Sequence, residues 1–215
     1  MKLHGVAFSN YYNLVKWGLL EKEMPFEEVL DPPSKEEAFL ANSPMGKIPY
    51  LECEEGCVSE SLAILVYLEK KKPHPRLFPE DAFEAARALQ IQLIIDHYVD
   101  ASARTLLGAA FFGKPASEEQ IEKALEKTRQ GLAALTRLTR FDPFIAGPEF
   151  THADLAAGLT IPLATSIFQI LRRLNLMAEI PGFTDYLARI SNMPNHQKVV
   201  ADQKAARDRL LASRS

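Results

Sequence analysis

Apolar and polar residues alternate with different periods before and after residue 73. In the first part, short runs typical of strands alternate with runs whose apolar residues recur at helical spacing. In chain order these runs are KLHGVAF, a helix through LVKWGLLEKE, FEEVL, a polar loop, IPYLEC, CVS and a helix ESLAILVYLEKK. The pattern predicts a β-α-β unit that is followed by a hairpin and a helix.

The second part begins after a proline-rich connector, KPHPRLFPED, and has helical periodicity throughout. Within it, the segment from Thr151 to Asp154 resembles a capping box with Asp in place of Glu, which predicts the start of a helix. We therefore predict two domains of different class. They are an α/β domain over residues 1–76 and an all-helical bundle over residues 84–215, joined by a linker over 77–83.

The composition is that of an ordinary globular protein of 215 residues, 47% hydrophobic and 25% charged. A net charge of −3, with Lys and Arg scattered among carboxylates, argues against a nucleic-acid partner. The longest uncharged run, residues 155–171, contains Pro162 and falls short of the ~20 apolar residues that span a bilayer, so we expect a buried core helix and no membrane partner. The first ten residues contain no long apolar run, so we expect no secretory signal and a cytoplasmic protein.

The sequence offers no pattern for a metal or nucleotide site. Cys53 and Cys57 are spaced C-x3-C, which matches neither a redox helix nor a zinc site, and we expect them to flank a hairpin turn. The five histidines are dispersed, and only His97, beside Asp96, is a candidate site residue. A glycine-rich phosphate loop is also lacking.

The stretch NSPMGKIPYLECEEGCVSESLAI, residues 42–64, carries the main chemical signal. Pro49 falls in a predicted strand, where a cis X-Pro bond costs only about 1 kcal/mol over trans and would turn the backbone of Ile48 toward a ligand. At the next helix start, Glu60 offers a carboxylate for an ammonium group, and Ser61 offers a hydroxyl with free N–H groups for a carboxylate. Together they predict a pocket for the zwitterionic end of a short peptide. The simpler alternative is an edge-strand proline and a helix cap.

At these residues the chain resembles the glutathione transferase family, and the resemblance covers essentially the whole chain. NSPMGKIPYL followed by SESLAI is similar to the glutathione-binding block of the family, and FIAGPEFTHADL is similar to the capping-box segment of its helical domain. The resemblance implies a thioredoxin-like domain followed by a helical bundle, with glutathione as co-substrate and no metal. It also implies a homodimer, for which the helix LIIDHYVDASARTLL, with mixed apolar and charged residues, is a candidate interface.

Carried onto matching positions, the resemblance assigns the glutathione-binding residues. Ile48, held by Pro49, would bind the cysteinyl backbone of glutathione, and Glu60 with Ser61 would hold its γ-glutamyl end. Two further residues, Lys35 and Lys47, fall where the family often places polar or basic side chains near the glycine carboxylate. An exposed lysine that is only solvated is the alternative for each.

The thiol of glutathione must become a thiolate, because the thiol is a poor nucleophile at neutral pH. In serine-type members of the family, the activating hydroxyl stands shortly before a basic residue of the first helix, as Ser9 stands before Lys16. Cysteine-type members, which favour disulfide exchange, have Cys at this place. Asn10, Tyr11 and Tyr12 are alternative donors to the sulfur, in which case Ser9 would only cap the helix.

The electrophile is not identified by the sequence. The family places its pocket between the domains, and the matching candidates here are Tyr11, Tyr12, Arg104, Phe111 and Phe112. For Phe111 and Phe112, burial in the core of the bundle is the favoured alternative.

The resulting expectation is a detoxification-type glutathione transferase that conjugates the glutathione thiolate to a small hydrophobic electrophile. The first alternative is another glutathione-dependent reaction, isomerisation or peroxide reduction, although SNYYN lacks the Ser-Ser-Cys type sequence of isomerases with this fold. The second is a non-catalytic ligand-binding or partner-binding relative. The intact Ile48-Pro49 and Glu60-Ser61 pairs argue against the second alternative.

Overall fold

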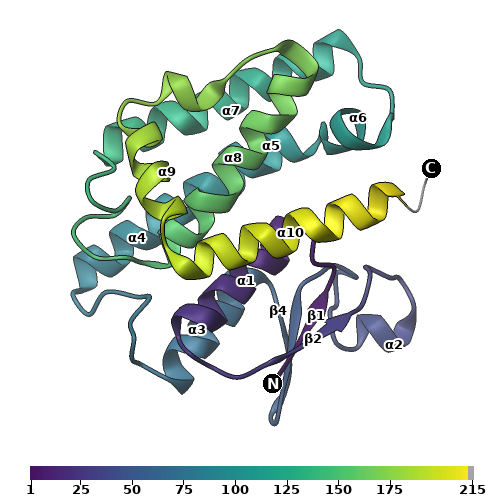
Figure 1. Cartoon of the computed structure of the whole chain (residues 1–215), viewed down its shortest axis with the longest axis vertical. Helices are drawn as coiled ribbons and strands as arrows, with labels where there is room; N and C mark the ends of the chain where they lie inside the picture. The colour runs from purple at the N-terminus through teal and green to yellow at the C-terminus, as the bar shows by residue number, and fades with distance from the viewer. Residues whose placement is uncertain (213–215) are drawn as a thin grey trace. The chain divides into compact units, whose positions relative to one another are not determined.

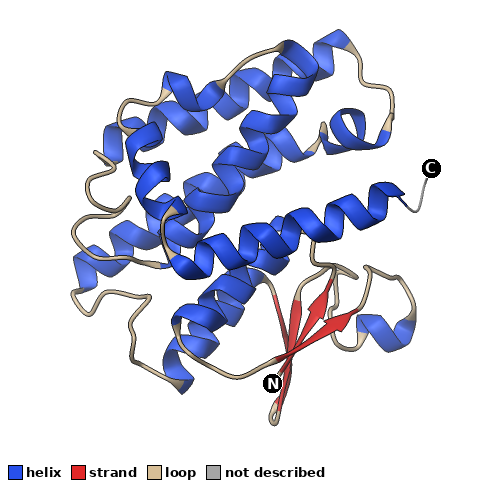
Figure 2. Ribbon diagram, viewed as in Figure 1, coloured by secondary structure: helices blue, strands red, loops and turns tan. Residues whose placement is uncertain are grey.

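The computed structural model describes residues 1–212, which form two compact units (Figure 1). The first unit comprises Met1–Leu77 together with the segment from Asn192 onward, and the second comprises Phe78–Ser191. The first unit contains all the strands of the described chain, and the second is helical (Figure 2). The predicted order of an α/β part before an all-α part is confirmed.

The first unit has the thioredoxin-like arrangement that the sequence predicts. Its sheet has the strand order β2-β1-β3-β4, in which β1 and β2 are parallel and the β1–β3 and β3–β4 pairs are antiparallel. The elements in chain order are β1 (Lys2–Gly5), α1 (Asn10–Glu21), β2 (Glu27–Leu30), α2 (Glu37–Leu40), β3 (Tyr50–Cys53), β4 (Gly56–Ser59) and α3 (Ser61–Lys71).

The two faces of this sheet have different characters. Successive strand residues point to opposite faces, so Leu3 and Leu51, which pair across β1 and β3 and are fully buried, share one face. His4 and Tyr50, the next pair in the register, share the other face. Phe39 of α2 packs edge-on against the Tyr50 ring at 5.5 Å between centroids, so α2 covers this second face. The helix α2 was not predicted, because its four residues lie in a polar loop and only Phe39 among them is buried.

The second unit is a helical bundle. Its elements are α4 (Ala82–Ile94), a π-helical turn (Ile95–Asp100), α5 (Ala101–Arg104), α6 (Leu107–Phe112), α7 (Glu118–Leu138), α8 (His152–Arg172), a short 3-10 turn (Leu176–Glu179) and α9 (Phe183–Ser191). The helical periodicity of the sequence gives no sign of a break between residues 82 and 112. The structure instead divides this stretch, first at the π-helical turn and again between α5 and α6.

Helix α8 is the core of the second unit. The capping box predicted at its start is present: Asp154 accepts from the Thr151 backbone N–H at 2.8 Å, and Thr151 closes the first turn. Asp154 also accepts from the Ile145 N–H and the Tyr186 hydroxyl, each at 2.9 Å. Helix α8 is long and apolar enough to cross a membrane, but 67% of its apolar window is buried inside the protein. The prediction of a buried core helix is confirmed.

The C-terminal helix α10 (Pro194–Ala212) groups with the first unit and contacts α1. The ammonium group of Lys16 in α1 lies 2.8 Å from Asp202 of α10 and 2.7 Å from Glu28 of β2. The compact units therefore differ at this end from the predicted helical domain, 84–215, which included α10. As domain boundaries, 1–76 and 84–215 stay a prediction.

Candidate functional site

The backbone around Ile48 lies at the entrance to β3. The Ile48–Pro49 bond is cis, as the sequence predicted, but Pro49 directly precedes the strand, which begins at Tyr50, and does not lie inside it. The backbone of Ile48 forms no hydrogen bond with other residues in the range 1–212. Its N–H and C=O are therefore available to pair with an extended peptide, as in strand addition.

Gly5 makes room beside this backbone. Its φ is +154°, and a Cβ there would lie 2.7 Å from Cδ2 of Tyr12 and 3.4 Å from the Cβ of Ile48. A side chain at position 5 would consequently push apart the start of α1 and the segment that enters β3. The sequence contained this residue in KLHGVAF, but its role depends on two neighbours that only the fold brings together.

The start of α3 places a carboxylate, that of Glu60, next to the partly positive N-terminus of the helix. Glu60 is the N-cap residue, with φ 68° and ψ 116°, and its exposed carboxylate makes no cap hydrogen bond. A positive φ is unusual for a residue other than glycine and is typically retained where function requires it. Ser61 begins the helix, whose first-turn N–H groups have no partner within the helix. An ammonium group can therefore bind Glu60 while a carboxylate binds the helix N-terminus.

Ser9 is the N-cap of α1 and is half-buried. Its hydroxyl oxygen accepts from the Tyr12 backbone N–H at 3.5 Å, which is a long hydrogen bond. Because the oxygen acts here only as an acceptor, the hydroxyl hydrogen is free to be donated to a ligand. Ser9 thus caps the helix and can serve as a donor at the same time, and the two predicted roles are compatible.

Asn13 braces the turn that carries Ser9, and sequence reasoning missed it. Its side-chain amide is fully buried and donates to the carbonyls of Ala7 at 2.7 Å and Ser9 at 2.8 Å. Gln203 of α10 donates to the Phe8 carbonyl at 3.3 Å. The backbone carbonyls of Ala7, Phe8 and Ser9 therefore each accept a hydrogen bond from a side chain of the same unit. The signal in the sequence was the i, i+4 spacing of Ser9 and Asn13, which places both on one face of a helix.

The alternative thiol donors differ in their surroundings. The Tyr12 side chain is 2% exposed and its hydroxyl donates to Glu28 at 2.7 Å; burial and this hydrogen bond raise the pKa of Tyr12. The Tyr12 hydroxyl is thus directed to β2. Its roles as a sulfur donor and as a wall of the electrophile pocket stay predictions. Asn10 is buried, and Tyr11 is half-buried.

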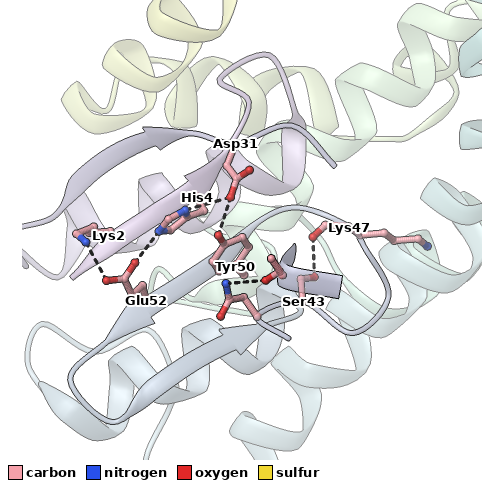
Figure 3. Close-up of polar contacts among 9 residues, drawn as sticks. Lys2, His4, Asp31, Ser43, Lys47, Tyr50 and Glu52 are labelled. Carbon is pink, nitrogen blue, oxygen red and sulfur yellow. Dashed lines mark hydrogen bonds and ion pairs between the residues drawn. The ribbon is translucent and has the colours of Figure 1, made fainter. Parts of the chain in front are cut away.

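Lys35 and Lys47 lie in the segment between β2 and β3. The Lys35 ammonium donates to the Met45 carbonyl at 2.8 Å, which braces the segment internally. Lys47 is exposed, and its own carbonyl accepts from the Ser43 hydroxyl at 2.7 Å while its side chain extends away from the sheet (Figure 3). Lys47 adjoins Ile48 in the chain and its ammonium is the freer of the two cations.

In the second unit, Arg104 is held by a bidentate ion pair with Asp100, at 2.6 Å and 2.9 Å. Phe111 is half-buried and Phe112 is 38% exposed on α6, a helix with no buried residue. The favoured alternative of a bundle-core position for these two phenylalanines is therefore wrong. Contact of Arg104, Phe111 and Phe112 with an electrophile stays a prediction.

The remaining candidates do not form a site. His97 is exposed on the π-helical turn, and Cys53 and Cys57 are half-buried free thiols on β3 and β4, where they flank the hairpin turn as predicted.

Comparison with known proteins agrees with this architecture. The model of the family described as "Glutathione S-transferase, N-terminal domain" matches residues 3–76. A glutathione S-transferase of Pseudomonas putida is 36% identical over 206 residues, which cover 96% of this chain and 94% of that protein. Among solved structures, glutathione transferase F2 from Populus trichocarpa has a TM-score of 0.79 at 23% identity, covering 95% of this chain and 99% of its own. A glutathione S-transferase from Methylobacterium radiotolerans, solved with glutathione sulfonate, has a TM-score of 0.73 at 26% identity, covering 93% of this chain and 95% of its own.

Proposed function

Because the chain belongs to the glutathione S-transferase family, we propose that it binds glutathione on the first unit and transfers the thiolate to a small hydrophobic electrophile. The observation that carries this proposal is the unpaired backbone of Ile48 beside the charged start of α3. Tyr50 pairs with Ser59 across β3 and β4, so Ile48 and Glu60 lie at the same end of this strand pair.

In this proposal, the recognition of glutathione is divided among three groups. The Glu60 carboxylate binds the γ-glutamyl ammonium, and Ser61 with the first-turn N–H groups of α3 binds the γ-glutamyl carboxylate. The backbone of Ile48, held by Pro49, pairs with the cysteinyl residue. Lys47, aided by Lys35, attracts the glycine carboxylate at the other end of the peptide.

The proposed chemistry begins with loss of the thiol proton to solvent. The Ser9 hydroxyl donates to the sulfur, and a donor to the charged form lowers the pKa of the bound thiol. The positive end of α1 acts in the same direction. The thiolate then forms a bond to the electrophilic carbon, and a leaving group, where the electrophile has one, departs with the electron pair of its bond.

The proposal is tested by calorimetric titration of the protein with glutathione, followed by a conjugation assay with 1-chloro-2,4-dinitrobenzene. Binding together with conjugation supports the proposed transferase. Binding without conjugation, but with isomerisation or peroxide reduction, supports the first alternative. Absence of binding at millimolar glutathione contradicts the proposal and favours a non-catalytic relative. The cytoplasmic location and the role in detoxification stay predictions.

Ser9→Ala is expected to shift the pH–rate curve of conjugation to higher pH. The variant loses a hydrogen bond that favours the thiolate, and a bond to a charged group contributes about 1.5 to 3 kcal/mol, so the pKa of the bound thiol rises by about one to two units. The affinity for glutathione changes little. Ultraviolet absorbance of the bound thiolate at neutral pH measures the shift directly. Tyr12→Phe is the control, because that hydroxyl is committed to Glu28. If Asn10→Ala or Tyr11→Phe abolishes the thiolate signal and Ser9→Ala keeps it, the donor is the neighbour.

Ser61→Ala is expected to weaken glutathione binding about tenfold, because it removes a donor to a charged carboxylate at the helix start. The melting temperature changes little, since Ser61 is a partly exposed residue of the first helical turn and is not the N-cap. Calorimetry of the variant and of an exposed-surface control, Lys70→Ala, measures the difference. An affinity within twofold of wild type would contradict the γ-glutamyl assignment.

We further propose a homodimer. Large apolar side chains are exposed on α4 and on the π-helical turn beside it, which is unusual for a monomer surface: Phe83, Leu89, Leu93 and Tyr98. Light scattering is expected to give a mass near twice 24.0 kDa at micromolar concentration. Leu93→Glu is expected to lower that mass toward the monomer, because a charge would be buried without a partner. A monomer mass for the wild type would contradict this proposal.

A further inference from the structure

A polar cluster on the α2 face of the sheet has His4 at its centre (Figure 3). The His4 side chain is largely buried, and its two ring nitrogens lie 3.3 Å from Oδ2 of Asp31 and 3.0 Å from Oε2 of Glu52. Lys2 also donates to Glu52, at 2.9 Å, and the hydrogen bonds from Lys2 and His4 lower the pKa of the Glu52 carboxyl.

Tyr50 extends this cluster to the segment between β2 and β3. Its ring stacks on His4 with 4.3 Å between centroids and 15° between planes, and its hydroxyl donates to Oδ2 of Asp31 at 2.6 Å. This is the same carboxylate oxygen that faces His4. Phe39 of α2 packs edge-on against the same tyrosine ring. The start of the segment, at Asp31, and its middle, at Phe39, are therefore both fastened to the sheet through one pair of stacked rings.

The segment from Asp31 to Lys47 is also braced internally. Lys35 reaches the Met45 carbonyl, and the Ser43 hydroxyl reaches the Lys47 carbonyl. Gly46 has φ +64° and lies so close to the Ser34 carbonyl that a Cβ there would collide with it. Because the segment is internally fixed, its contacts with the sheet determine the orientation of the loop from which the side chains of Lys35 and Lys47 extend.

The fully buried leucines of β1 and β3 do not belong to this cluster. Leu3 and Leu51, the fully buried pair of the same two strands, lie on the opposite face of the sheet. The carboxylates of the cluster are partly exposed, at 28% for Asp31 and 41% for Glu52. Exposed charge pairs contribute little to stability, which favours a role in fixing geometry over a role in holding the fold.

We propose that His4 is a positioning residue. Through Asp31 and Tyr50 it holds the segment 31–47, and so determines how strongly the site prefers glutathione over γ-glutamylcysteine, which lacks the glycyl residue. The inference rests on the proposed glutathione site and adds to it a specificity determinant that touches no part of the peptide. The two ends of the peptide are thereby recognised independently: the γ-glutamyl end at α3, and the glycyl end at a segment whose position depends on His4.

The test is calorimetric titration of the full chain with glutathione and with γ-glutamylcysteine. His4→Phe keeps a ring against Tyr50 but removes both hydrogen bonds to carboxylates. It is expected to weaken glutathione binding about tenfold and to leave γ-glutamylcysteine binding within about twofold. Lys2→Gln, which removes the outer partner of Glu52 and leaves His4 in place, is the matched control and should keep the wild-type ratio. Asp31→Asn changes the other partner of the His4–Asp31 contact and should have the same effect on the two affinities as His4→Phe. The test therefore does not depend on the folding of the His4 variant alone.

A double variant, His4→Phe with Lys47→Gln, distinguishes positioning from a general loss of structure. If His4 acts through the segment that carries Lys47, the double variant binds glutathione about as weakly as the single variant of lower affinity. The reason is that the free-energy effects of two coupled substitutions do not add. Equal weakening of both peptides, or an unchanged ratio in both His4→Phe and Asp31→Asn, overturns the inference while leaving the proposed function in place. Failure of the wild type to bind either peptide overturns both.

Discussion

Replacing Asp154 by alanine is expected to lower the free energy of unfolding by about 4 kcal/mol, one of the two largest effects predicted for this chain. Its carboxylate accepts four hydrogen bonds, from the backbone N–H groups of Ile145 and Thr151 and from the hydroxyls of Thr151 and Tyr186. Burial raises the pKa of Asp154 to about 6, although the four donors oppose this shift. Alanine would leave buried donors without an acceptor in a site that water does not reach.

Chemical denaturation of wild type and variant measures this difference. Tyr186→Phe removes one of the four hydrogen bonds and is expected to cost about 1 kcal/mol, so the two variants form a graded series. Asp185→Ala, at an exposed aspartate of α9, is the matched control and should stay within about 0.5 kcal/mol of wild type. If Asp154→Ala resembles this control, the four hydrogen bonds do not stabilise the start of α8 as argued.

Lys16→Met is expected to lower the free energy of unfolding by about 3 kcal/mol. The Lys16 side chain is only 2% exposed, and its ammonium lies between Glu28 and Asp202, which come from β2 and α10. Methionine has a similar length and stays apolar, so packing is largely kept, but the two carboxylates lose their shared cation. The side chains of Glu28 and Asp202 are 42% and 37% exposed, so water can solvate them in the variant. The expected loss of stability is therefore at the lower end of the range for a buried ion pair that loses one partner.

Two measurements separate this effect from a general loss of packing. Lys198→Met removes the other cation on Asp202, 3.1 Å away and 55% exposed, and is expected to cost less than about 0.5 kcal/mol. Hydrogen exchange should show faster exchange of the α10 amides in Lys16→Met than in Lys198→Met, because Lys16 connects α10 to α1 and β2. Equal effects of both variants would contradict the assignment of Lys16 as the shared cation.

One short segment of the sequence carried the local geometry that the structure shows, and the binding roles of its residues stay predictions. The stretch with Ile48, Pro49, Glu60 and Ser61 contained its own geometry: a cis X-Pro bond before a strand and polar residues at a helix start. Tyr12 has surroundings that nothing local in the sequence distinguishes from those of Tyr11. Its hydroxyl is drawn to Glu28, a residue of another strand.

Several elements depended on contacts that the sequence pattern does not contain. Helix α2 is too short for periodicity to reveal, and it is held by one ring contact between Phe39 and Tyr50. The π-helical turn after Ile94 is not visible in the sequence pattern, because its buried residues Ile95 and Val99 keep the i, i+4 apolar spacing of a helix. Helix α10 reads like the other helices of the bundle, yet its Asp202 pairs with Lys16 of the first unit.

The sequence by itself determined the order of the strands and the longer helices, the class of each part, the start of α8 at Thr151, and the cis bond and helix start in the segment from Ile48 to Ser61. These are local properties, in which periodicity, caps and backbone restrictions act over a few residues. Only the tertiary structure decided which hydroxyl is free at the start of α1, which helix completes the first unit, and that His4 faces two carboxylates. Each of these depends on residues distant in the chain that approach within hydrogen-bonding distance, and a pairing of this kind is specified by the packing of the whole unit, which leaves no local pattern.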